Sequence, residues 1–224
     1  MNNSIYHLSI PSLLLALSLT LIVVVIYARW SLKPGTILYA TLRMVIQLVL
    51  IGFGLDYIFN QNNRFVISSI LVIMLIAASW ISLRPIKKNR KQFFHKALIA
   101  ILIGGGLTIV VIIGGVIQLT PWYEPHYLIP IAGMIFSNSM NSVSLAAERF
   151  QVELKQNKSY TEARGIALQT SLLPTINILF SVGLVSLPGM MTGQILSGIS
   201  PLIAVRYQIM VMCMILASSG LSAA

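Results

Sequence analysis

A dense run of amide and hydroxyl side chains interrupts an apolar stretch at residues 137–144, where six of the eight residues are Ser or Asn. On an α-helix, five residues from this region would fall within one stripe about 80° wide. These are Met134, Asn138, Asn141, Leu145 and Glu148, and Ser137 and Ser144 border the stripe. Amides and a carboxylate on one line cannot face lipid without a desolvation cost of several kcal/mol. We therefore expect the stripe to face other helices or a water-filled cavity.

Two interpretations of this stripe stay open. Asn138, Asn141 and Ser144, together with Met140 beside them, are candidates to line the path of a transported solute. Alternatively, the amides are hydrogen-bond donors that join neighbouring helices, each pair contributing about 0.6 kcal/mol.

Two further segments carry side chains that could bind a solute. Arg43 and Gln47 lie one helical turn apart inside an apolar segment, and a polar pair in such a position is a functional-site hypothesis. The alternative is that Arg43 extends to the headgroup region.

The segment 187–202 has two prolines, three glycines and no charge, which is typical of a broken or re-entrant segment. Its candidate soft or neutral ligands are Met190, Met191 and Gln194. The alternative is a simple outer turn in which methionines fill gaps.

The segment 148–170 is polar and charged, and it is long enough for two or three helical turns. Glu162 follows Ser159 by three residues, which is the spacing of a capping box and predicts a helix start at Ser159. We expect a short amphipathic helix here that docks a cytoplasmic partner. A solvated basic loop against anionic lipid is the alternative. The candidate coupling residues are Glu148, Arg149, Glu162 and Arg164.

The composition of the chain indicates that these side chains lie on membrane-spanning helices. The chain is 57% hydrophobic and 9% charged, whereas soluble domains carry about 25% charged residues. An all-α polytopic integral membrane protein is therefore predicted, with residues 1–224 forming a single transmembrane domain. Apolar runs of spanning length predict seven spans, at about 8–28, 37–58, 66–83, 97–118, 127–147, 171–187 and 203–224.

The distribution of basic residues predicts the orientation. The connections at residues 29–33, 84–96 and 148–164 hold 12 of the 15 Lys and Arg residues. Because cytoplasmic loops carry the excess of Lys and Arg, we expect the N-terminus outside and the C-terminus in the cytoplasm. The predicted location is the inner or plasma membrane, as a multi-pass protein.

Several function classes are excluded by motif. The sequence has no Gly-x-x-x-x-Gly-Lys-Ser/Thr phosphate-binding loop, no zinc-protease or serine-hydrolase signature and a single cysteine, Cys213. All five acidic residues lie at or beyond the ends of the predicted spans. An enzyme is not expected, and no metal ligand is assigned. The net charge of +10 reflects membrane orientation rather than a nucleic-acid partner.

Three stretches together carry a family resemblance. They are LRMVIQLVLIG at 42–52, GMIFSNSMNSVSLAAER at 133–149, and the region that runs from PTIN at 174 through VGLVSLPGMMTGQIL to PLIAVRYQI at 201–209. In this order they resemble the FetB-like permeases of ABC-type metal exporters, which have plant relatives linked to aluminium tolerance. The matching positions include Arg43, Gln47, Asn138, Met140, Asn141, Ser144, Arg149, Pro188, Gly189, Met190, Met191, Gly193 and Gln194.

The resemblance implies a permease subunit that exports iron or another metal ion through the lipid bilayer. It implies a separate cytoplasmic ABC ATPase that binds and hydrolyses ATP, while this chain binds no cofactor of its own. It also implies a pair of permease copies, with ATPase closure transmitted through segment 148–170. Two alternatives from other classes are a membrane scaffold or assembly protein, and a secondary transporter that needs no ATPase.

Overall fold

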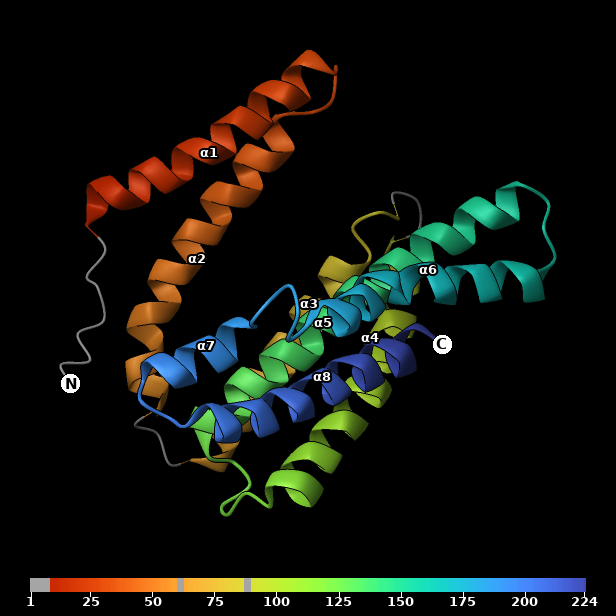
Figure 1. Cartoon of the computed structure of the whole chain (residues 1–224). Coiled ribbons are helices and arrows are strands. Elements are labelled where there is room, and N and C mark those ends of the chain that lie inside the picture. The colour runs from red at the N-terminus through yellow and green to blue at the C-terminus, as the bar shows by residue number, and fades with distance from the viewer. Residues whose placement is uncertain (1–8, 60–62, 87–89) are drawn as a thin grey trace. The chain divides into compact units, whose positions relative to one another are not determined.

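A computed structural model describes residues 9–59, 63–86 and 90–224, and its regular elements there are helices (Figure 1). The chain divides into two compact units, residues 1–60 and 61–224, which are described separately. The helices are α1 (Ile10–Arg29), α2 (Gly35–Phe59), α3 (Arg64–Ser82), α4 (Arg90–Val110) with a π-helical continuation η1 (Val111–Ile117), α5 (Pro125–Lys155), α6 (Tyr160–Ser181), α7 (Gly189–Leu196) and α8 (Pro201–Ala223). The all-helical prediction is confirmed. The single transmembrane domain stays a prediction.

The first unit contains α1 and α2. The hydroxyl oxygen of Ser9 accepts a hydrogen bond from the backbone N–H of Ser12 and caps α1, and Pro11 occupies the first turn, where its missing N–H costs nothing. Large apolar side chains along both helices remain exposed. Exposed apolar surface of this extent is what a helix pair embedded in lipid requires.

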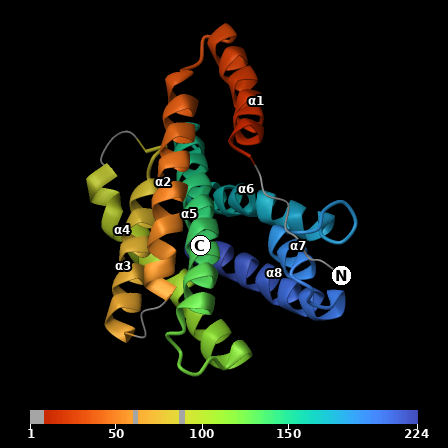
Figure 2. The same ribbon diagram turned by 90° about the vertical axis from the view of Figure 1, so that its left-hand side faces the viewer.

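The second unit is built around α5, which packs against α3, α4, α6 and α8. Figure 2 shows α3 and α4 on one side of α5, and α6, α7 and α8 on the other. Helix α8 also packs against α4 and α6, so the core of this unit lies where α4, α5 and α8 meet. Ile101, Ile135 and Met214, one from each of these helices, are almost fully buried there.

Five helices in the described parts of the chain are long and apolar enough to cross a membrane: α1, residues 35–54 of α2, α3, α4 together with η1, and α8. The span predicted at 127–147 falls within α5, whereas the span predicted at 171–187 runs six residues past the end of α6 at Ser181. Neither helix is among the five. Both helices carry many Ser, Thr and Asn side chains, and α5 ends in a charged turn. Seven spans and the orientation of the termini therefore stay predictions.

The predicted broken segment at 187–202 contains a separate helix, α7, of eight residues. It begins after Pro188, whose carbonyl accepts a hydrogen bond from the N–H of Thr192, and it packs against α8. A helix at this place argues against a simple turn.

Candidate functional site

The stripe of amides lies on the face of α5 that points away from its most buried contacts. Asn141 is exposed and Asn138 is half-buried. The Nδ2 group of Asn138 donates a hydrogen bond to the carbonyl oxygen of Met134, 2.8 Å away on the same helix. This bond does not join α5 to another helix, so it gives no support to the helix-joining interpretation. Of the other two path candidates on α5, Met140 and Ser144 are both half-buried.

The opposite face of α5 carries a buried seam of hydroxyl groups that the sequence reasoning missed. The Ser139 hydroxyl donates to the carbonyl oxygen of Ser218 at 3.2 Å, and the Ser222 hydroxyl lies 3.0 Å from Ser139 Oγ. Gly104 of α4 completes this contact, because a Cβ atom there would come within 2.6 Å of the Ser222 backbone nitrogen. The spacing of Ser218 and Ser222, four residues apart, is the signal that would have located this seam.

Segment 148–170 is not a separate short helix, which corrects the sequence prediction. It consists of the end of α5 and the first half of α6, joined by a short turn. Asn157 adopts a left-handed conformation in this turn (φ 59°), which Asn tolerates better than most residues. The predicted helix start is confirmed, because the Ser159 hydroxyl accepts a hydrogen bond from the N–H of Glu162. We call residues 148–170 the hairpin tip.

A buried carboxylate holds the hairpin tip together. The Glu153 side chain is fully buried, and its two oxygens lie 2.5 Å from Nη2 of Arg149 and 2.8 Å from Nζ of Lys158. Lys158 lies beyond the turn, so the ion pair joins the end of α5 to the start of α6. The hydrogen bond from Lys158, with the positive charge of Arg149, lowers the pKa of Glu153 although burial opposes this, and the same hydrogen bond raises the pKa of Lys158.

Two of the four predicted coupling residues take part in this network. Arg149 binds Glu153 directly, and the carboxylate of Glu162 lies 3.8 Å from Nζ of Lys158. Glu148 is exposed and lines a cavity of about 200 Å³ together with Arg149 and Thr170 of α6. Sequence reasoning missed Glu153 itself. The spacing of Arg149 and Glu153, four residues apart, was the available signal.

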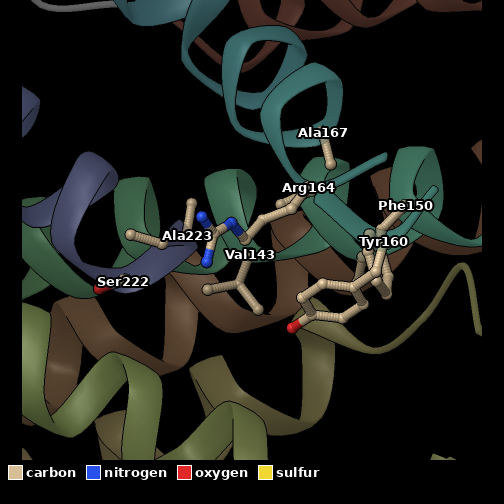
Figure 3. A pocket seen from close by; sticks show the side chains of 10 residues that line it. Val143, Phe150, Tyr160, Arg164, Ala167, Ser222 and Ala223 are labelled. Carbon is tan, nitrogen blue, oxygen red and sulfur yellow. The ribbon is translucent and has the colours of Figure 1, made fainter. Parts of the chain in front are cut away.

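The fourth coupling candidate, Arg164, lines a cavity of about 230 Å³ between α5, α6 and the end of α8 (Figure 3). Figure 3 shows its guanidinium group extending past Val143 toward Ala223. The ring of Tyr160 packs edge-on against Phe150, with centroids 5.6 Å apart. The cavity is therefore lined mostly by apolar side chains, with one positive group from Arg164 and the hydroxyl-bearing side chains of Tyr160 and Ser222.

The remaining predicted residues lie elsewhere. Met190, Met191 and Gln194 are half-buried on α7, and the Oε1 atom of Gln194 is buried without a hydrogen-bond partner among the described residues. Arg43 and Gln47 are exposed on α2, in the first unit. Within the described residues, no three His, Cys, Asp or Glu side chains come together to hold a metal ion.

Comparison with known proteins gives a consistent family assignment. Residues 10–224 match the model of a family described as "Uncharacterised protein family (UPF0014)". No solved structure matches the chain.

Three curated relatives are similar to the chain over most of its length. The chain is 36% identical to the UPF0014 membrane protein slr1647 of Synechocystis over 84% of this chain and 78% of the relative. It is 34% identical to the "Probable iron export permease protein FetB" of Escherichia coli over 97% and 88%. It is 32% identical to the Protein ALUMINUM SENSITIVE 3 of Arabidopsis thaliana over 90% and 78%.

The resemblance found in the sequence is therefore confirmed, because both a bacterial permease named for iron export and a plant protein named for aluminium sensitivity are among the relatives. The chain belongs to the UPF0014 family of membrane proteins.

Proposed function

We propose that the chain is the permease subunit of an ABC transporter that exports metal ions, with iron as the leading cargo and a separate cytoplasmic ATPase as its partner. The name of the Escherichia coli relative supports the cargo. The sequence holds no phosphate-binding loop of its own, so ATP binding and hydrolysis belong to the partner. The site of action is the inner or plasma membrane.

The hairpin tip is the observation that carries the proposal. Helix α5 has 31 residues and is therefore about 46 Å long, which exceeds the roughly 30 Å of a bilayer core. Figure 1 shows the α5–α6 connection at the end of the second unit opposite α7. That connection carries Lys155 and Lys158, and a basic end is expected to face the cytoplasm.

A segment that transmits ATPase closure has to be stiff, because a flexible one would absorb the movement. The ion network of Arg149, Glu153 and Lys158 links the two helices of the tip on both sides of the turn. Movement of the tip would therefore be passed to α5 as a whole. In this proposal Glu148, Arg149, Glu162 and Arg164 are the residues that contact or support the ATPase.

The amide stripe is the proposed solute path. It runs from Asn138 through Asn141 to Glu148, so it ends at the hairpin tip. Polar side chains that are exposed in a single chain need water or a second protein surface in the bilayer. Two permease copies that place these stripes on either side of a central path would supply both. Met140 and Ser144 flank the path, and Met190, Met191 and Gln194 of α7 are candidates for its gate. Arg43 and Gln47 remain path candidates from the first unit.

The proposal is tested by co-expression with the ABC ATPase encoded nearest to it. We expect the two chains to purify together and to lower cellular iron in an ATP-dependent way. The control replaces the phosphate-binding lysine of the ATPase with alanine, which should abolish iron export without affecting co-purification. If no ATPase purifies together with the chain, the scaffold alternative is favoured. Iron export that persists with the inactive ATPase would favour a secondary transporter.

A further inference from the structure

A second cavity in the 61–224 unit, of about 430 Å³, lies between the end of α6, α7 and α8. Most of its wall is aliphatic. The exceptions are one amide and three sulfur-bearing side chains, which are Gln208, Met191, Met212 and Cys213. None of the four belongs to the amide stripe or to the hairpin tip.

The helices explain why these side chains line one cavity. Gln208 and Met212 are four residues apart on α8 and so share one face. Cys213 follows directly and lies at the edge of that face, where it is exposed. Met191 comes from α7, which packs against α8. Sulfur-bearing residues from two helices thus line the same cavity.

Gln208 gives the independent sign of a ligand. Gln208 is only 4% exposed, yet neither its Oε1 nor its Nε2 atom has a hydrogen-bond partner among the described residues. A buried amide without a partner is unfavourable, and buried polar groups in proteins are almost always satisfied. A bound species that accepts an electron pair from Oε1, such as a cation, would satisfy the oxygen.

The donor set selects the class of ligand. Thioether and thiolate sulfur are soft donors that favour Cu(I) and similar ions, whereas imidazole is the common ligand of mononuclear non-haem iron, and carboxylate and water are those of magnesium. Among the described residues, no carboxylate or imidazole lines this cavity. A single thiolate balances one positive charge, so a monovalent cation leaves the site neutral, and a divalent one leaves an uncompensated charge in an apolar wall.

We propose that this cavity binds one thiophilic monovalent cation, of the Cu(I) or Ag(I) class, through the thiolate of Cys213, the thioethers of Met191 and Met212, and Oε1 of Gln208. Binding replaces the thiol proton of Cys213, and that proton is released to solvent. Met191 is also a gate candidate of the proposed iron path, but cation binding at this cavity requires neither iron export nor the ATPase and is measured on the purified chain alone.

The first experiment measures Cu(I) affinity of the untagged, detergent-purified protein by anaerobic competition with a chromophoric Cu(I) chelator. We expect one Cu(I) per chain, with proton release that Cys213→Ser removes. Met191→Leu and Met212→Leu should each weaken binding by about tenfold or more, while preserving side-chain volume and folding. The matched control is Met210→Leu on the same helix, because Met210 lines a different cavity.

The second experiment uses Cys213, the single cysteine of the chain, as its own reporter. Ag(I) should protect it from maleimide labelling, and the Ag(I) concentration for half-protection should rise about tenfold in Met191→Leu and Met212→Leu but not in Met210→Leu. Fe(II) should give no protection. If only Cys213→Ser changes Cu(I) binding, or if the three methionine variants behave alike, a lone thiol is responsible and the proposal is wrong.

Discussion

The ammonium group of Lys158 lies 2.8 Å from Oε2 of the fully buried Glu153, although a helix end and a left-handed turn separate the two residues. The contact closes the connection between α5 and α6 by a charge-assisted hydrogen bond, which is stronger than a neutral one. Since Arg149 approaches the other oxygen of the same carboxylate, Glu153 is the residue on which the geometry of the hairpin tip depends.

Replacement of Glu153 by glutamine should loosen the hairpin tip. The variant keeps the shape of the side chain but removes its charge, so Arg149 and Lys158 lose the carboxylate that pairs with both of them. We expect backbone amides of residues 150–162 to exchange with deuterium about tenfold faster or more in lipid nanodiscs. Glu148→Gln is the matched control, because Glu148 is exposed on the same helix. Equal protection in the two variants would show that the ion network does not stabilise the tip.

The order of the hairpin tip should depend on pH at both extremes. The pKa of Glu153 is lowered from its ordinary 4.5. The stability that the ionised carboxylate gives to the folded tip is therefore complete above that pH and is lost as pH falls through the folded pKa. The pKa of Lys158 is raised from 10.5. The stability that the charged ammonium group gives to the folded tip is therefore complete below that pH and is lost as pH rises through the folded pKa. The tip should therefore stay ordered across the interval between 4.5 and 10.5.

A spin label can measure this pH dependence. Gln156→Cys in a Cys213→Ser background places one label in the exposed turn. Its mobility should rise at the acidic and the alkaline end, and Glu153→Gln should be mobile throughout. Mobility that does not change with pH in the parent protein would contradict the assigned pKa shifts.

Gly104 should not tolerate a side chain. A Cβ atom there would lie 2.6 Å from the Ser222 backbone nitrogen and 2.9 Å from the Leu221 carbonyl carbon, and backbone atoms cannot move aside cheaply. We expect Gly104→Ala to lower stability by about 1–3 kcal/mol, measured as a lower melting temperature in detergent. The matched control is Gly106→Ala, whose Cβ would meet only a Leu102 methyl group at 3.8 Å. Similar melting temperatures would mean that α4 and α8 do not pack this closely.

Local signals in the sequence were sufficient for some of these features. The spacing of Ser159 and Glu162 predicts the start of α6, because a helix cap depends only on residues within one turn. Family membership followed from long runs such as PGMMTGQIL.

Features that depend on distant residues could not be predicted. Hydropathy ends the predicted fifth span at residue 147, whereas α5 continues to Lys155 because its charged turn packs against α6. The burial of Glu153 depends on how the chain returns after Asn157. Ser139 and Ser218 meet across 79 positions, and Met191 shares a cavity with Cys213 only because α7 folds back on α8. A single sequence holds no local signal for such contacts.

The amide stripe gives the most direct test of transport. Asn138→Leu and Asn141→Leu should each abolish ATPase-dependent iron export while expression stays normal, because leucine removes the polar groups that a hydrated ion needs along its path. Cellular iron measured with and without the ATPase is the readout.

Asn141→Ser is the matched control, since it keeps a hydrogen-bonding group at the same exposed position and should retain most export. Because the Asn138 amide already bonds to Met134 within α5, its loss should leave the melting temperature nearly unchanged. Loss of export accompanied by a large fall in melting temperature would instead indicate a structural role, and unchanged export would remove the stripe from the path.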